Sequence, residues 1–74
     1  MREFYAYEYP AGLNARSAAT GNPYRTVYAF GSARERNAYV DAAPCDSGNG
    51  ARRAVTRKHL SAAEFANRRD GTYA

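Results

Sequence analysis

The chain has 74 residues, a net charge of +4, one cysteine and one histidine. A chain of this length forms one domain, here residues 1–74, and buries only about 60% of the surface that its unfolded form exposes. A single cysteine excludes an intrachain disulfide, and one Cys with one His excludes a Cys/His zinc site, so we expect neither metal nor other cofactor.

The start of the chain, MREFYAYEYPAG, lacks the long apolar run of a secretory signal peptide. No stretch approaches the roughly 20 apolar residues of a membrane span. The lone Cys45 fits a reducing compartment better than secretion. We therefore expect a soluble cytoplasmic protein that makes no membrane contact.

Residues 2–9, REFYAYEY, predict the first strand, because side chains of one kind recur at every second position. Phe4 and Ala6 lie on one face of this strand. The other face carries three aromatic residues: Tyr5, Tyr7 and Tyr9.

Residues 10–23 are rich in Gly, Pro, Asn, Ser and Thr and predict a long loop between two strands. Residues 24–30, YRTVYAF, predict the second strand. Tyr24 and Tyr28 share one face of it and are candidates to lie beside the tyrosines of the first strand. Two consecutive strands most simply pair antiparallel.

Two Ser-x-x-Glu sequences predict helix starts, at Ser32 with Glu35 and at Ser61 with Glu64. In such a capping box the serine hydroxyl accepts from the backbone N–H of the glutamate, whose carboxylate accepts from the serine N–H. The first box predicts a helix over residues 33–43, which a proline ends.

The second helix start is reinforced by Leu60 and Phe65, which have the spacing of a hydrophobic staple. Arg68 and Arg69 suit the C-terminal end of the helix dipole, and Gly71 is a candidate left-handed cap.

Residues 51–58, ARRAVTRK, predict a third, short strand, from the alternation of Arg53, Val55 and Arg57. The resulting order is ββαβα. The predicted fold is an α+β domain with a three-stranded antiparallel sheet and two short helices on one face of it.

Candidate catalytic residues are few. Cys45 and His59 form no known local signature of a nucleophile and its base. Glu35 and Glu64 are explained by capping, and DSGNG lacks the lysine and the following helix of a phosphate-binding loop. We therefore expect a protein that is not an enzyme.

The best candidates for binding are aromatic and basic residues. If the helices cover the Phe4 and Ala6 face, the tyrosines of the first strand point outward. Exposed tyrosines flanked by arginines are typical of protein-interface hot spots and of surfaces that stack single-stranded nucleic acid. The alternative is that this face packs on the helices. The candidate partner-binding residues are Tyr5, Tyr7, Tyr9, Arg52, Arg53, Arg57 and Lys58.

The basic residues have three explanations. They fit a phosphate backbone, they fit a solvated strand edge protected from pairing, and the excess of Arg over Lys also suits a GC-rich genome. The stretch VYAFGSARERNAYV looks like the strand-to-helix junction of an RNA recognition motif, but the basic-Gly-aromatic-Gly opening of that motif is absent.

The stretches YRTVYAFGSARERNAYVDA and RRAVTRKHLSAAEF resemble small proteins encoded by phages and mobile elements, several of which are anti-CRISPR inhibitors. The resemblance covers roughly residues 24–66 and consists of strand aromatics, helix caps and helix alanines. It implies a stoichiometric inhibitor that binds a CRISPR effector complex and blocks target DNA binding or activation in the host cell. The alternatives are a small basic nucleic-acid-binding accessory domain and a subunit of a larger assembly.

Overall fold

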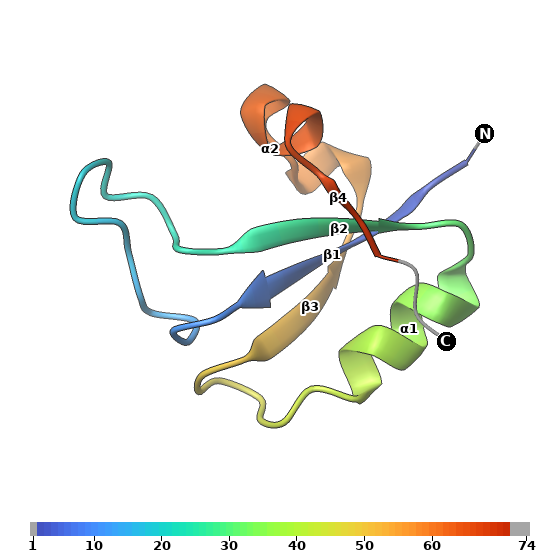
Figure 1. Ribbon diagram of the computed structural model, residues 1–74, viewed down its shortest axis with the longest axis horizontal. Coiled ribbons are helices and arrows are strands. Elements are labelled where there is room, and N and C mark those ends of the chain that lie inside the picture. The colour runs from blue at the N-terminus through green and yellow to red at the C-terminus, as the bar shows by residue number, and fades with distance from the viewer. Residues whose placement is uncertain (1, 72–74) are drawn as a thin grey trace.

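A computed structural model of the protein describes residues 2–71. Its sheet has four strands in the order β3-β1-β2-β4 (Figure 1). The strands are β1 (Phe4–Tyr9), β2 (Thr26–Phe30), β3 (Ala51–Val55) and β4 (Arg69–Asp70). The helical elements are α1 (Ala33–Asp41), the 3₁₀ turn η1 (Arg57–His59) and α2 (Ala62–Ala66). No helix within residues 2–71 has the length and apolar character needed to cross a bilayer.

The α+β class is confirmed, and β1 pairs antiparallel with β2 as predicted. β1 also pairs antiparallel with β3, a neighbour that the prediction left open. The three-stranded antiparallel sheet is wrong in one respect, because β4 adds a fourth strand parallel to β2. The Gly71 N–H donates to the Ala29 carbonyl at 2.9 Å, continuing this pairing. The sheet is therefore mixed.

The two helices do not cover the same face of the sheet, which corrects the predicted arrangement. The ring of Tyr39 in α1 packs on Phe30, with ring centroids 5.2 Å apart, and joins Ala6 in one apolar cluster. Leu60 and Phe65, which flank the start of α2, pack instead against the cluster that contains the β1 tyrosines. Both faces of β1 carry apolar side chains, so each face needs a cover of its own.

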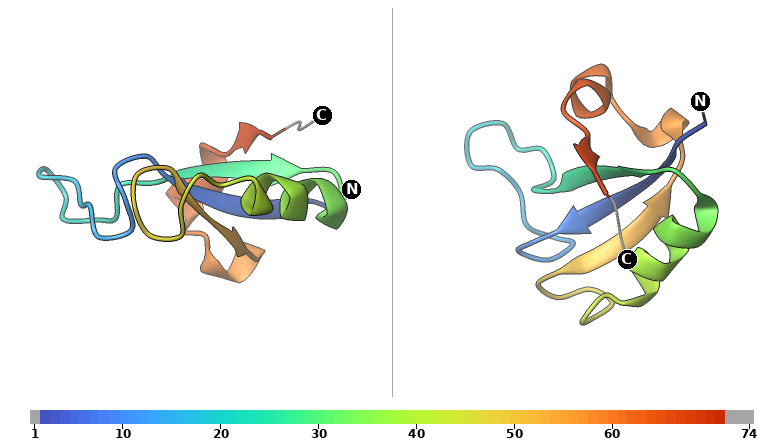
Figure 2. Two further views of the ribbon diagram at one scale, coloured as in Figure 1. Left: turned by 90° about the horizontal axis from the view of Figure 1, so that it is seen from below. Right: turned by 45° about the vertical axis from the view of Figure 1, so that its right-hand side comes forward.

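Figure 1 and the right-hand view of Figure 2 show the strands between α1 and α2. The loop that joins β1 to β2 extends away from the strands in the same views, as expected for residues 10–23. Within it, Arg16 and Pro23 form an isolated antiparallel bridge.

The second capping box is complete. The Ser61 N–H donates to a Glu64 carboxylate oxygen and the Glu64 N–H donates to the Ser61 hydroxyl, both at 3.1 Å. The first box is half formed: Ser32 accepts from the Glu35 N–H at 3.1 Å, but within residues 2–71 the Glu35 carboxylate makes no return bond. A complete box allows α2 to begin although it has only five residues.

Element bounds differ from the predicted ones by a few residues. The second strand begins at Thr26 and the first helix ends at Asp41. The third strand ends at Val55, after which η1 (Arg57–His59) replaces the predicted end of that strand. The Thr56 N–H donates to Nδ1 of His59 at 3.2 Å. This backbone group therefore bonds within the turn and does not extend the strand.

Gly71 is not the left-handed cap of the last helix. Its φ is not positive, whereas other described glycines, such as Gly50, do have a positive φ. The Arg68 side chain instead donates to the Phe65 carbonyl at 2.8 Å and satisfies the end of α2. Gly71 has a packing role, because a Cβ placed there would lie 2.6 Å from the Phe30 ring.

We expect Gly71→Ala to lower the free energy of unfolding by about 1–3 kcal/mol, because the methyl group must displace a buried ring. Gly31→Ala is the matched control, since a Cβ at Gly31 meets nothing within 4 Å. Chemical denaturation of the two variants and the wild type measures the difference. Equal stability of the two variants would contradict the close packing of Gly71 on Phe30.

Candidate functional site

The tyrosines of β1 are buried, so the alternative that this face packs on helical elements is the one observed, and the outward arrangement is wrong. Exposure is 7% for Tyr5, 3% for Tyr7 and 6% for Tyr9. The proposed neighbours are also wrong in part, because Tyr28 pairs with Ala6 and therefore lies on the other face. The assignment of the three β1 tyrosines to a partner surface stays a prediction, and exposure no longer supports it.

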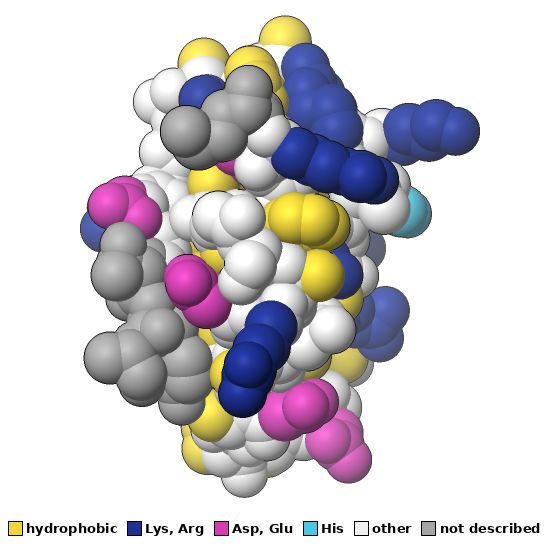
Figure 3. All heavy atoms as spheres, turned by 90° about the vertical axis from the view of Figure 1, so that its right-hand side faces the viewer, with side chains coloured by type: hydrophobic (Ala, Val, Ile, Leu, Met, Phe, Trp, Pro, Cys, Tyr) yellow, Lys and Arg dark blue, Asp and Glu magenta, His cyan; other side chains and the backbone are white. Residues whose placement is uncertain are grey.

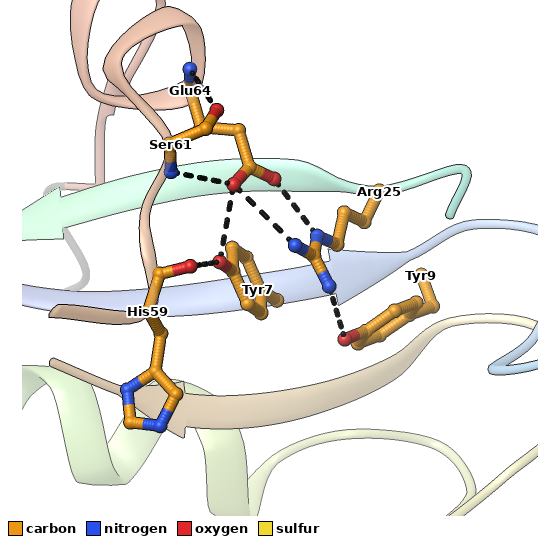
Figure 4. A network of polar contacts seen from close by, with 6 residues as sticks. All are labelled: Tyr7, Tyr9, Arg25, His59, Ser61 and Glu64. Atoms are coloured by element: carbon orange, nitrogen blue, oxygen red, sulfur yellow. Dashed lines mark hydrogen bonds and ion pairs between the residues drawn. The ribbon is translucent and has the colours of Figure 1, made fainter. Parts of the chain in front are cut away.

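A polar network fixes η1 and α2 over this tyrosine face (Figure 4). The Arg25 guanidinium pairs with the Glu64 carboxylate at 2.8 Å and lies 3.9 Å from the centroid of the Tyr7 ring. It also donates to the Tyr9 hydroxyl at 3.4 Å. Arg25 thus joins α2 to two rings of β1.

The Tyr7 hydroxyl completes the network. It donates to the His59 carbonyl at 2.7 Å and lies 3.3 Å from a Glu64 carboxylate oxygen. Burial raises the pKa of Tyr7 to about 12. The hydroxyl is therefore neutral at physiological pH and anchors η1 to the sheet.

Burial acts to raise the pKa of Glu64, but hydrogen bonds from Arg25 and from the Ser61 N–H outweigh it and place this pKa below its ordinary value of 4.5. The carboxylate accepts from a guanidinium and a backbone N–H, and the Tyr7 hydroxyl lies 3.3 Å from one of its oxygens. Its acceptor positions are taken up by the protein itself, and the network holds the fold together.

The predicted basic residues lie on different sides of β3. Arg52 stacks on Tyr39 at 3.9 Å, donates to its carbonyl at 2.7 Å and lies 3.7 Å from Glu8, all on the α1 side. Arg53 is exposed and pairs in register with Tyr7, on the α2 side. Strand alternation therefore separates two adjacent arginines that the sequence analysis had grouped.

Arg57 and Lys58 lie in η1 and are both exposed. The Arg57 guanidinium lies 4.0 Å from the centroid of the Phe65 ring and donates to the Leu60 carbonyl at 3.3 Å. Within residues 2–71, no carboxylate pairs with Arg53, Arg57 or Lys58. All three of these basic residues are exposed.

Two further arginines join Arg57 around an open cleft of about 410 Å³. Arg2 precedes β1 and Arg36 comes from α1, so the three arginines come from distant parts of the chain. Figure 3 views the end of the molecule from which the chain enters β1, and basic side chains gather on its upper right. The sequence analysis missed Arg2 and Arg36 because no local spacing relates them to Arg57.

Cys45 and His59 have separate local contacts. The Cys45 thiol donates to the Asn49 carbonyl at 3.1 Å. Nδ1 of His59 accepts from the Thr56 N–H and lies 3.0 Å from the Thr56 hydroxyl. Among the described residues no group of three or more His, Cys, Asp and Glu side chains is placed to hold a metal ion.

Comparison of the chain with models of known families, with curated proteins and with solved structures finds no match. The interpretation of the site therefore depends on the contacts and charges of its own residues.

We expect acidification to destabilise the protein partly through Glu64. Its folded pKa is lowered, so the unfolded chain takes up the proton first, and the stabilisation is present above about pH 4.5 and is lost as the pH falls through the folded pKa. Glu64→Gln should lower the free energy of unfolding at pH 7 by about 1 kcal/mol and reduce the further loss in acid. Urea denaturation from pH 7 to pH 3 measures both.

Glu35→Gln is the control, because the Glu35 carboxylate makes no capping bond within residues 2–71. This variant should keep the wild-type loss of stability in acid. If the free energy of unfolding fell equally between pH 7 and pH 3 for Glu64→Gln and the wild type, Glu64 would not contribute to the loss of stability in acid.

Proposed function

We propose that the protein is a small stoichiometric binding protein that inhibits a nucleoprotein complex, in the manner of anti-CRISPR inhibitors of CRISPR effector complexes. The observation that carries the proposal is the exposed basic surface on the α2 side, made of Arg53, Arg57 and Lys58. The resemblance of residues 24–66 to small phage-encoded proteins supports the same class of function.

A nucleoprotein complex is a suitable partner for this surface, because it presents both phosphates and carboxylates. Guanidinium groups bind either anion through charge-assisted hydrogen bonds. A protein bound at the place where target DNA docks would block binding of that DNA or prevent the activating conformational change. Binding alone suffices for this function, so no catalytic step is proposed.

The burial of the β1 tyrosines changes which residues we assign to the contact. Tyr7 and its neighbours support the surface from beneath, and Arg52 is engaged by Tyr39 on the other side of the sheet. The exposed residues of β3 and η1 are the direct contacts in this proposal.

A nucleic-acid-binding accessory domain is the second candidate. The cleft lined by Arg2, Arg36 and Arg57 favours it, because three guanidiniums around one cleft suit a phosphate backbone. The two candidates differ in whether protein remains bound once nucleic acid is removed.

A pull-down from a bacterial lysate that contains a CRISPR effector, with and without nuclease, distinguishes the two. We expect the effector proteins to be retained after nuclease treatment. Arg53→Glu with Lys58→Glu should weaken binding of the purified effector by at least about tenfold, since reversed charges repel an anionic partner.

The control is Arg16→Glu with Arg34→Glu, which makes the same charge change at exposed residues outside β3 and η1. It should retain most of the affinity. Equal loss in the two double variants would contradict the assigned surface, and loss of all partner proteins with nuclease would favour the second candidate.

A further inference from the structure

The cleft at the beginning of β1 combines positive charge with an aromatic ring. The residues that line it include three arginines, Arg2, Arg36 and Arg57, and one carboxylate, Glu3, so three positive charges and one negative charge give a local net charge of +2. Glu3 is already engaged, by the Arg68 guanidinium and the Tyr5 hydroxyl, each at 3.0 Å. Among residues 2–71, no carboxylate pairs with an arginine of the cleft.

The Arg36 side chain is held in place by backbone carbonyls. One terminal nitrogen donates to the carbonyls of Tyr5 and Val55, each at 3.3 Å, and these two residues are paired between β1 and β3. Its Nε donates to the Asn37 side chain at 2.7 Å. Carbonyl partners orient a guanidinium without neutralising it, which is the arrangement required to receive an anion from outside.

Phe4 gives the cleft its aromatic component. It is half-buried and lines the cleft, and the guanidiniums of Arg2 and Arg36 lie 5.6 and 5.9 Å from its ring centroid. A half-buried ring with guanidiniums over it can contact a flat aromatic group while the arginines bind an adjacent anion. Unpaired nucleotides contain both groups, a base and a phosphodiester.

We propose that this cleft binds single-stranded nucleic acid, with Arg2, Arg36 and Arg57 on the phosphates and Phe4 against a base. A duplex stacks its bases internally and offers no free base face to a ring in a cleft, so the single strand is the better fit. An acidic peptide supplies the charge but no base for the Phe4 ring. The inference rests on the proposed function in that the nucleoprotein partner supplies the strand.

The test is fluorescence anisotropy of the purified full-length protein with labelled 12-nucleotide single strands, oligo-dT and oligo-rU, from 50 to 200 mM salt. Arg2→Gln with Arg57→Gln should weaken binding about tenfold and reduce the log-log salt slope by about 1.4, the contribution of two phosphate contacts on a single strand. Binding of either strand supports the proposal, and the better of the two identifies the source as DNA or RNA.

Arg16→Gln with Arg34→Gln is the matched control, because it removes two exposed charges that lie outside the cleft. Arg2→Gln alone is a second variant that removes no side-chain hydrogen bond among residues 2–71, and it should still weaken binding. Phe4→Leu should lower affinity and leave the salt slope unchanged, which a purely ionic attraction would not produce.

Four results would overturn the inference: no binding of either strand, equal loss in the cleft and control double variants, equal affinity for a 12-base-pair duplex, or equal affinity for polyglutamate. Failure here with intact retention of effector proteins in the nuclease-treated pull-down removes the cleft and leaves the proposed function standing. Binding of the oligonucleotides without retention of effector proteins would remove the proposed function and leave the strand-binding cleft standing.

Discussion

Burial of three tyrosine rings on one face of β1 is the constraint on which the rest of the structure depends. Tyr5, Tyr7 and Tyr9 are too large to be covered by two neighbouring strands alone, and the hydroxyl of a deeply buried tyrosine needs a polar partner. The segment that contains η1 and α2 meets both needs. It packs Leu60 against the rings and accepts the Tyr7 hydrogen bond at a backbone carbonyl.

The packing of η1 and α2 on the tyrosines determines which arginines pair with carboxylates of the fold. Three arginines pair with carboxylates inside the fold, in the pairs Arg25–Glu64, Arg52–Glu8 and Arg68–Glu3. The basic residues of η1 and those that line the cleft at the beginning of β1 have no such partner among residues 2–71. The arginines that pair with no carboxylate among residues 2–71 suit an anionic partner. The proposed inhibition of a nucleoprotein complex and the proposed strand-binding cleft both use this second set.

The sequence was sufficient to predict local features and insufficient for those that need distant contacts. Alternation correctly placed the three β1 tyrosines on one face, and the Ser61 capping box marked the start of α2. Alternation did not show which helix covers which face, because Phe4 and Ala6 make the other face apolar too. β4 has two residues without a pattern and depends on pairing with β2. The cleft could not be predicted from the sequence either, since Arg36 is held there by hydrogen bonds to the carbonyls of Tyr5 in β1 and Val55 in β3.

The most direct test of the central claim is chemical nitration of the native protein by tetranitromethane, with the modified tyrosines located by mass spectrometry over time. Among the tyrosines of residues 2–71, Tyr24, which is 55% exposed, should be nitrated first, whereas Tyr5, Tyr7 and Tyr9 should react only under unfolding conditions. Nitration of Tyr7 or Tyr9 at the rate of Tyr24 would contradict the account, because it would place the tyrosine face of β1 in solvent rather than under α2.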